Sequence, residues 1–373
     1  MNIGFITTYF YPVLGGAEAN CYYLAKELAK RHEVHVFTST QGNLPEEETI
    51  HQIHIHRSKE LIRVGYYGAF YPSLLKKILS YELDILHVQS FGFLWHDLCV
   101  LLKKAASSHT KLVITAHGPF MALASYPLWK RAVGSVVKIL EYLPNSFYDL
   151  VIQVNPSQRQ WLLRYGFRTS KIRFLPNGVP VSALKRHPTM KDLAGRFIIS
   201  YIGRVQRYKG LNQVIHILPD LIRKNKKILF VIAGHPEDMH HLVNLSRSLS
   251  VGNNVLFLGT ITEEDKYSLL ATTNVFVFPS KWEAFGISML EAMSQGCPVI
   301  STRTEGGAYL IEEGTNGFLF DYGNTQELKE KILLLMNNKK LATTISKNNA
   351  KKAKTYTWEK ISQDLEQLYL RIR

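Results

Sequence analysis

Two glutamates in the segment 279–302 give the chain its clearest capacity for chemistry. The segment reads PSKWEAFGISMLEAMSQGCPVIST, with Glu283 in a loop that follows an apolar strand. Glu291 lies about one turn into a helix that begins at Phe285-Gly286. A carboxylate at Glu291 can accept two hydrogen bonds from a vicinal diol such as a ribose, and Glu283 is placed to hold a second polyol such as a sugar. The helix start offers free N–H groups and a positive dipole end, which suit a phosphate.

Each glutamate taken alone has a simpler explanation, as a solvated loop residue or as a partner of the helix dipole. The two together, with Phe285-Gly286 between them, favour a ligand site. Two cations strengthen this interpretation, because Arg204 and Lys209 flank a loop after the first strand of the second half, in YIGRVQRYKGLNQV (201–214). Fixed cations beyond a strand end can neutralise a diphosphate, Arg by a planar fork and Lys as a point charge. Basic residues are common in this chain, so Arg204 and Lys209 alone would not indicate a ligand site. They support one because they are expected at the same sheet edge as the two glutamates.

The first half offers a pair of glycines and a histidine. The turn after the first strand, YFYPVLGGAEAN (9–20), contains neither GxGxxG nor a Walker A sequence. Gly15 and Gly16 either let the backbone approach an oxyanion beside a helix start or form a plain tight turn, and the sequence leaves both open. His117, in TAHGPF (115–120), follows another strand. It either serves a ligand site, as a partner of a sugar hydroxyl or as an acid or base, or is a satisfied core histidine.

Metal-binding patterns are missing from the sequence. It contains no HExxH, no DxD and no cluster of cysteines and histidines, so we expect no protein-bound catalytic metal and no cofactor. His54 and His56 read as alternation along a strand. The three cysteines (Cys21, Cys99 and Cys297) lie far apart, which suggests a reducing cytoplasm.

The elements that must position these residues follow an alternating pattern. Short apolar runs alternate with helical patterns, which predicts an α/β fold with parallel sheets covered by helices. A segment rich in proline and glycine, 176–196, interrupts the alternation and is predicted to link two domains. Each half is predicted to be a Rossmann-like, doubly wound unit, the two facing across a cleft, with ligands at the carboxyl ends of the strands. The predicted strands are 2–8, 34–39, 53–56, 84–88, 111–116, 149–154 and 171–175, then 197–203, 227–234, 254–259, 274–279, 297–302 and 317–321.

The length, composition and charge of the chain argue against several classes of protein. The chain has 373 residues, longer than one hydrophobic core usually grows, and 46% of them are hydrophobic, which excludes a disordered chain. No apolar run approaches the roughly 20 residues of a membrane-spanning helix, and the N-terminus does not read as a signal peptide. The net charge of +15 must attract something anionic, such as nucleic acid, a membrane surface or a phosphorylated small molecule. It is spread evenly over the two halves without a recognised binding motif, which argues against nucleic acid.

Together the motifs resemble the retaining glycosyltransferases of family 4, which have the two-Rossmann-domain architecture called GT-B. The block EAFGISMLE (283–291) followed by AMSQGCPVI carries most of the resemblance, and the other matching pieces extend over almost the whole chain. These pieces are GGAE (15–18), TAHG (115–118), PNGV (176–179), Gly203-Arg204 with Lys209-Gly210, and AG (233–234). The resemblance implies domains at 1–180 and 181–355, with an amphipathic last helix at 356–373 that packs back on the first domain.

The resemblance also implies a role for each matching residue. Arg204 and Lys209, beyond Gly203, bind the diphosphate of a nucleotide-sugar donor. Glu291 holds the ribose and Glu283 contacts the donor sugar. The resemblance makes Arg204, Lys209, Glu283 and His117 the expected catalytic residues. The remaining implied positions are the backbone at Phe285, Gly286 and Ile287 for sugar or phosphate, Thr260 and Ile261 near the base, Gly15 and Gly16 for the phosphate, and His117 beside the transferred sugar. The residues after His117 read GPF, which departs from the family's usual pattern.

The expected activity is retaining transfer of a sugar from a UDP- or GDP-sugar to an acceptor, without a protein nucleophile or a bound metal. The acceptor is predicted to be a lipid or a lipid-linked or cell-envelope glycan. A soluble glycosyltransferase acting on a small sugar or polysaccharide is the first alternative. A nucleotide-sugar epimerase of the same fold and a non-catalytic nucleotide-sugar sensor are the others.

The prediction of a lipid acceptor rests on a stretch without acidic residues between Asp97 and Glu141. Basic residues with tryptophan and tyrosine suit an anionic membrane surface, whereas an ordinary helix with a core face and a basic face explains the pattern equally well. We expect a cytoplasmic protein that binds the inner face of the membrane peripherally. The stretch contains Lys103, Lys104, Lys111, Tyr126, Leu128, Trp129, Lys130, Arg131, Val133, Val136, Val137 and Lys138, and the segment 64–77 is aromatic and then basic.

Overall fold

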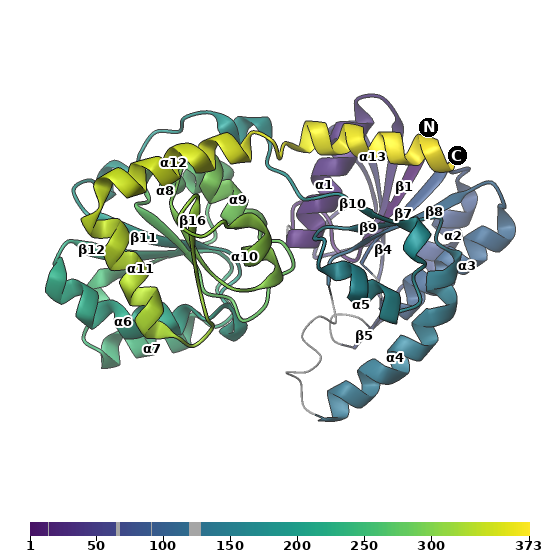
Figure 1. Ribbon diagram of the computed structural model, residues 1–373. Helices are drawn as coiled ribbons and strands as arrows, with labels where there is room; N and C mark the ends of the chain where they lie inside the picture. The colour runs from purple at the N-terminus through teal and green to yellow at the C-terminus, as the bar shows by residue number, and fades with distance from the viewer. Residues whose placement is uncertain (14, 65–67, 91, 119–127) are drawn as a thin grey trace. The chain divides into compact units, whose positions relative to one another are not determined.

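The computed structural model describes residues 1–373 except 14, 65–67, 91 and 119–127, and it leaves the side chains of 64, 68, 128–134, 137 and 138 undefined. The chain divides into two units (Figure 1). Unit 1 consists of Met1–Asn177 and Trp358–Arg373, and unit 2 of Gly178–Thr357. Each unit has one large sheet built mainly from parallel strands, with helices between them, so the predicted α/β fold is confirmed.

The large sheet of unit 1 has eight strands in the order β10-β9-β8-β7-β1-β2-β4-β3. All neighbours are parallel except β3 and β4, which are antiparallel. The strand order reverses between β1 and β7, so the loops after these two strands diverge at one edge of the sheet. The strands are β1 (Asn2–Ile6), β2 (Glu33–Ser39), β3 (Glu47–Ile50), β4 (Ile53–Ser58), β7 (Ile85–Gln89), β8 (Lys111–Ala116), β9 (Leu150–Gln153) and β10 (Ile172–Phe174).

The helices of unit 1 and its central strands contribute to a core of aliphatic and aromatic side chains. A short antiparallel pair, β5 (Ile62–Val64) and β6 (Gly68–Phe70), was not predicted, and neither was β3. In the described part of the chain no helix combines the length and apolar character needed to cross a bilayer. The helices are α1 (Gly16–Ala29), α2 (Ser73–Ser80), α3 (Leu94–Ala106), α4 (Leu128–Phe147), α5 (Gln158–Arg164) and α13 (Trp358–Ile372).

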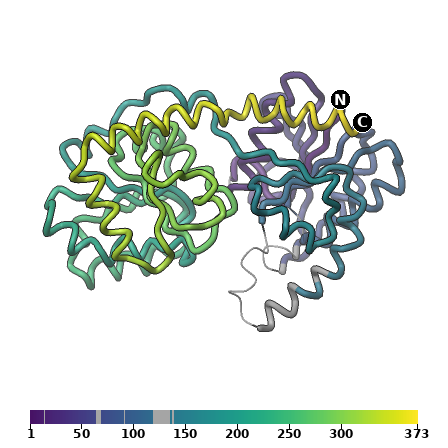
Figure 2. The backbone as a smooth tube through the Cα atoms, in the orientation of Figure 1, coloured from purple at the N-terminus to yellow at the C-terminus, as the bar shows by residue number. Residues whose placement is uncertain are grey.

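The last helix, α13, packs against α1 in unit 1, and Figure 2 shows the two ends of the chain side by side there. The Trp358 ring is almost fully buried and stacks on Tyr23, with ring centroids 5.5 Å apart and planes 9° from parallel. At the other end of the helix, the Tyr369 hydroxyl lies 2.6 Å from Nδ1 of His87, inside strand β7. The final 16 residues are therefore part of unit 1, and their buried side chains belong to its core.

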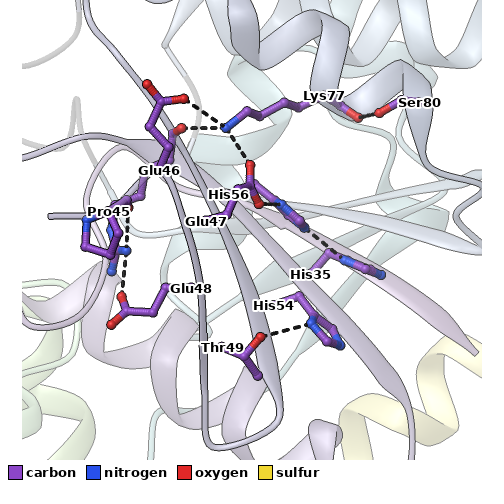
Figure 3. A network of polar contacts seen from close by, with 11 residues as sticks. His35, Pro45, Glu46, Glu47, Glu48, Thr49, His54, His56, Lys77 and Ser80 are labelled. Atoms are coloured by element: carbon purple, nitrogen blue, oxygen red, sulfur yellow. Dashed lines mark hydrogen bonds and ion pairs between the residues drawn. The ribbon is translucent and has the colours of Figure 1, made fainter.

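The predicted strand alternation of His54 and His56 is confirmed, since both lie on β4. Figure 3 shows them beside His35 of β2. Nδ1 of His35 is 3.0 Å from Nε2 of His56, and Glu47 of β3 pairs with Nδ1 of His56. The Lys77 ammonium of α2 lies 2.7 Å from the same Glu47 carboxylate. The network ties the edge strand β3 to β4 and α2.

Unit 2 has a six-stranded parallel sheet in the order β13-β12-β11-β14-β15-β16. Its strands are β11 (Phe197–Ile202), β12 (Ile228–Ala233), β13 (Val255–Gly259), β14 (Val275–Phe278), β15 (Val299–Thr302) and β16 (Gly317–Phe320). Its helices are α6 (Leu211–Lys224), α7 (Met239–Ser248), α8 (Glu263–Thr272), α9 (Ile287–Ser294), α10 (Glu305–Leu310), α11 (Thr325–Asn337) and α12 (Lys339–Ala353). The strand order reverses between β11 and β14.

The segment predicted as a linker, 176–196, is irregular but is mostly an integral part of unit 2. It forms two 3₁₀ turns, Val181–Leu184 and Lys191–Leu193, which bury Ala183 and Leu193. Regular periodicity is lacking because short turns, rather than a helix or strand, carry these apolar side chains into the core.

Candidate active site

The loops after β11 and β14 lie at the point where the strand order of unit 2 reverses. Ligands of doubly wound sheets bind at this position, outside the carboxyl ends of the strands. The first loop, 203–210, carries Lys209, and the second, 279–286, carries Glu283. The two residues singled out from separate parts of the sequence therefore face each other across the reversal point.

Lys209 and Glu283 form an ion pair, with Nζ 2.8 Å from Oε2. The Lys209 side chain is only 10% exposed, and its ammonium lies 5.1 Å from the centre of the Phe278 ring. Burial by itself would lower the pKa of Lys209, but the Glu283 carboxylate and the hydroxyls of Tyr201 and Tyr208 raise it above its usual value. Lys209 is therefore a positive charge, held in place and largely shielded from water.

Two aromatic rings lock the same two loops together. Tyr208 and Trp282 stack face to face, with centroids 4.0 Å apart and planes 2° from parallel. The N–H of Lys281 donates to the carbonyl of Tyr208 over 2.7 Å. Sequence reasoning missed this pair, although each ring is the immediate neighbour of a predicted site residue. The stack fixes the distance between the loops and so positions Lys209 against Glu283.

Glycines allow backbone segments at this edge to approach closely. Gly234 has φ +137°, and a Cβ there would overlap the carbonyl oxygen of Gly203. Gly210 has φ +67°, and its Cβ would overlap the carbonyl oxygen of Pro279. Only glycine combines this left-handed backbone with such contacts. The loop with Lys209 is thereby packed directly onto the loop with Glu283.

Helix α9 begins beside this ion pair. Gly286 is its N-cap residue, with φ +84°, and Ile287 is the first helical residue. Phe285 is buried, and the N–H of Gly306 donates to the carbonyl of Glu283 over 2.9 Å. The predicted helix start is confirmed within two residues. Gly286 has no side chain that could cap the helix, and the N–H of Met289 donates to the Gly286 carbonyl over 3.0 Å. Among the described residues, the N–H groups of Ile287 and Ser288 are thus the donors of the first turn that face the loop.

Glu291, one turn into α9, has a partner that the sequence did not reveal. Its Oε1 lies 2.6 Å from Nζ of Lys266, on α8, and Lys266 also contacts Oε1 of Glu263 at 2.6 Å. Burial raises the pKa of Glu291, and the Lys266 ammonium opposes that rise. Thr260, exposed, and Ile261, half-buried, lie in the turn just before α8.

The position of Arg204 differs from that of Lys209. Its side chain is exposed, just beyond Gly203, and its carbonyl accepts a hydrogen bond of 3.0 Å from the Tyr201 hydroxyl. Arg204 and Lys209 thus share one loop as predicted, and Lys209 is held by an ion pair with Glu283. An exposed arginine can reach a ligand that approaches from solvent.

Three predicted site residues, Gly15, Gly16 and His117, belong to unit 1. Neither glycine has a positive φ. A Cβ at Gly15 would collide with the carboxylate of Glu18. At Gly16, no atom of the described residues beyond its chain neighbours and its own helix backbone lies within 4 Å of the position a Cβ would take. The open space is therefore at Gly16, and Gly15 makes room for Glu18.

His117 is oriented by Gln89, whose Oε1 lies 2.6 Å from its Nε2. An amide oxygen only accepts, so Nε2 must donate. Burial lowers the pKa of His117 to about 3, and the ring is therefore neutral at physiological pH. A neutral ring that donates from Nε2 presents Nδ1 as an acceptor, which suits a hydroxyl donor rather than a phosphate.

Metal-ligating side chains do not converge at these positions. Among the residues that the structure describes, no group of three or more histidine, cysteine, aspartate or glutamate side chains is arranged to hold a metal ion. The charged groups of the site are instead paired lysines and glutamates.

Comparison with known proteins identifies the family. Residues 14–183 match the family Glycosyltransferase Family 4, and residues 190–352 match Glycosyl transferases group 1. The two matches meet near the boundary between the two units. The chain belongs to the family 4, group 1 glycosyltransferases. The family predicted from the sequence motifs is thus confirmed, and the epimerase alternative is set aside.

Several proteins match this glycosyltransferase over nearly their whole length. It is 26% identical over 381 residues to N-acetyl-alpha-D-glucosaminyl L-malate synthase of Bacillus anthracis, covering 96% of this chain and 94% of the relative. Sucrose-phosphate synthase of Thermosynechococcus elongatus has the same fold, with a TM-score of 0.84 at 20% identity, covering 100% and 98% of the two chains. HepE of Anabaena, crystallised with UDP-glucose, has a TM-score of 0.77 at 21% identity, covering 99% of each chain. The GT-B fold is therefore confirmed.

Proposed function

We propose that this glycosyltransferase transfers a sugar from a UDP-sugar to its acceptor with retention of the anomeric configuration. The observation that carries the proposal is the buried Lys209 ammonium, paired with Glu283 at the strand reversal point beside the uncapped start of α9. A fixed positive charge and free helix N–H groups at one place match a diphosphate. The crystal structure of HepE with UDP-glucose supports uridine as the base.

The chemistry that these groups supply is stabilisation of a leaving group. As the bond between the sugar and the diphosphate breaks, negative charge grows on the phosphate oxygen. Lys209, Arg204 and the N–H groups at Gly286 and Ile287 would stabilise that charge without first having to reorganise. In the proposed front-face reaction the departing oxygen takes the proton of the attacking hydroxyl, so that neither a protein nucleophile nor a bound metal is needed.

The rest of the donor is assigned to neighbouring groups of unit 2. Glu291 would hold the ribose, Glu283 a hydroxyl of the sugar, and the turn at Thr260 and Ile261 the base. In unit 1, the open space at Gly16 suits a phosphate oxygen, and Nδ1 of His117 suits a sugar hydroxyl. The proposal thus assigns a role to the predicted site residues of unit 1 as well as to those of unit 2.

Thermal unfolding in a panel of nucleotide sugars tests the donor. A UDP-sugar at 100 to 1,000 times its dissociation constant is expected to stabilise the protein by roughly 2–4 kcal/mol, because it binds the folded state alone. The panel should pair each UDP-sugar with the GDP- and ADP-forms. An upward shift in Tm with GDP- or ADP-sugars alone would contradict the uridine assignment, and no shift with any nucleotide sugar would contradict the donor site.

We further propose that the acceptor is a lipid or lipid-linked sugar, reached at the cytoplasmic face of a membrane. The described part of α4 exposes a stripe of apolar side chains, of which Ile139 is 74% exposed. Asp97 and Glu141, the acids that bound the acid-free stretch, are both buried and place no charge on the surface. The apolar stripe consists of Val136, Ile139, Leu140, Leu143 and Phe147 on α4, and α3, which packs against α4, exposes Leu94, Leu98 and Leu102.

An amphipathic helix of this kind buries its apolar face at a membrane surface when basic residues accompany it. The basic residues Lys130, Arg131 and Lys138 lie on the same helix, although their side chains, with residues 119–127, are outside the described part of the chain. Apolar exposure on α4 is the observation that favours a membrane over an ordinary solvated helix, whose exposed face would be polar.

Sedimentation with anionic vesicles is expected to bring down the wild-type protein at low salt and less of it at high salt. The double variant Ile139→Glu/Leu143→Glu should sediment several-fold less. Leu334→Glu is the matched control, since Leu334 is a 40% exposed leucine on α11 of unit 2 and should leave sedimentation unchanged. Wild-type protein that stays in solution at low salt would rule out the membrane surface. It would favour the soluble alternative, which the names of the malate and sucrose-phosphate synthases support.

A further inference from the structure

The first turn of α8 places a lysine against the carboxylate that the proposed function assigns to the ribose. Lys266 lies on α8 and Glu291 on α9, two helices that pack against each other. Both side chains are almost buried, with 12% of Lys266 and 10% of Glu291 exposed, and Nζ lies 2.6 Å from Oε1. The ammonium also lies 4.8 Å from the centre of the Tyr267 ring. Lys266 is therefore held firmly beside Glu291 rather than moving freely in solvent.

The contacts of this pair leave a defined set of groups for a ligand. Within the described chain, Oε2 of Glu291 has no hydrogen-bond partner, whereas Oε1 is taken by Lys266. An ammonium has three N–H donors, of which Glu291 and Glu263 occupy two. One carboxylate oxygen and one N–H thus remain. A hydroxyl both donates and accepts, so a vicinal diol can satisfy these two groups together.

A buried carboxylate needs its counterion to remain ionised. Burial without a partner favours the neutral acid, which offers one oxygen as donor and is a poorer acceptor for hydroxyls. Lys266 supplies the opposite charge, with its Nζ 2.6 Å from Oε1 of Glu291. The two hydrogen bonds that Glu291 is expected to accept from a diol must therefore accommodate Lys266, which already contacts Oε1.

We propose that Lys266 is a positioning residue for the nucleotide: it holds Glu291 as an oriented carboxylate and, with it, selects a donor whose ribose carries a free vicinal diol. The inference rests on the proposed donor site and adds a specificity element that comes from α8. The proposed role of Lys266 is in binding the nucleoside. Contacts with the reacting atoms of the sugar and phosphate are assigned to Lys209 and its neighbours.

Calorimetric titration of the full chain with UDP and with its 2′,3′-dideoxy analogue tests the proposal. Wild type should bind UDP at least tenfold more tightly than the analogue, the size expected for losing a hydrogen bond to a charged group. Lys266→Met should lose about tenfold in affinity for UDP but little for the analogue, so that discrimination nearly disappears. Lys266→Arg keeps the charge and should recover part of the discrimination between UDP and the analogue. Lys329→Met, which breaks an ion pair with Asp220 on another face, should bind both ligands as wild type does.

Two further variants separate this inference from the proposed function and from folding. Glu291→Gln should lose discrimination by itself, and Lys266→Met/Glu291→Gln should be no worse than Glu291→Gln, because the lysine acts through the carboxylate. The double variant leaves no unpaired buried charge, so its folding controls for that of Lys266→Met. Wild-type discrimination in Lys266→Met, with discrimination lost in Glu291→Gln, would overturn the role of Lys266 and leave the donor site intact. Wild-type discrimination in Glu291→Gln would overturn both.

Discussion

Replacing Lys209 with methionine is expected to lower kcat for release of UDP from the donor by about 10²–10³-fold, the usual cost of removing one fixed donor to developing charge. Methionine fills a similar volume and keeps the contact with the aromatic rings, but it removes the ammonium. Because Lys209 is buried and paired with Glu283, its ammonium is held at a fixed position. The rate should be measured with the donor that the thermal panel selects.

Two variants make the Lys209 result specific. Lys281→Met removes an exposed positive charge from the neighbouring loop and should keep kcat within a few-fold of wild type. Lys209→Met/Glu283→Gln removes the carboxylate that the single variant leaves unpaired, so it should regain stability but not activity. Recovery of activity in this double variant would show that the loss came from the unpaired Glu283, and the assignment of Lys209 to the leaving group would then be wrong.

Replacing Trp358 with alanine is expected to lower the free energy of unfolding of unit 1 by about 3–5 kcal/mol. Trp358 is 1% exposed, and removing the ring leaves a cavity beside Tyr23 and frees the first turn of α13. Urea unfolding followed by far-ultraviolet circular dichroism should show the effect as a lower midpoint. Trp358→Phe keeps an aromatic ring on Tyr23 and should lose less.

The control for Trp358 lies on the same helix. Leu370 is 51% exposed, so Leu370→Ala should change the free energy of unfolding by less than about 0.5 kcal/mol. If Trp358→Ala destabilised the protein no more than Leu370→Ala, α13 would contribute little to unit 1. The contacts of Tyr369 with His87 of β7 and of Glu366 with Arg31, just after α1, would then not hold the helix in solution.

The strands of both sheets could be predicted because a buried parallel strand is a short continuous apolar run. β1, β11 and β12 are such runs, and their predicted limits are within about two residues of those observed. β3 (Glu47–Ile50) could not be predicted in the same way. It lies at the edge of the sheet, its residues are half-buried or exposed, and its polar sequence matches that of a loop.

In the candidate site, too, some contacts between residues could be predicted from the sequence and others could not. Lys209 and Glu283 follow strand ends, so the rule for doubly wound sheets brings them together without knowledge of packing. The partner of Glu291 depends on how α8 packs against α9, and nothing in the local sequence of Lys266 indicates that contact. The stack of Tyr208 on Trp282 was missed for the same reason, because it joins residues more than seventy positions apart.

The excess of positive charge is also clearer in the structure. Lys209 and Lys266 are each paired with a glutamate, so the donor site contributes little to the net charge of +15. Of the predicted donor cations, Arg204 has the exposed side chain. Most of the excess therefore lies outside this site.

A crystal structure of the protein with UDP tests the donor site most directly. We expect the diphosphate within hydrogen-bonding distance of Nζ of Lys209 and of the first N–H groups of α9, and a ribose hydroxyl on Oε2 of Glu291. UDP bound to unit 2 away from Lys209, or with its ribose turned away from Glu291, would contradict the assignment of these residues to the donor.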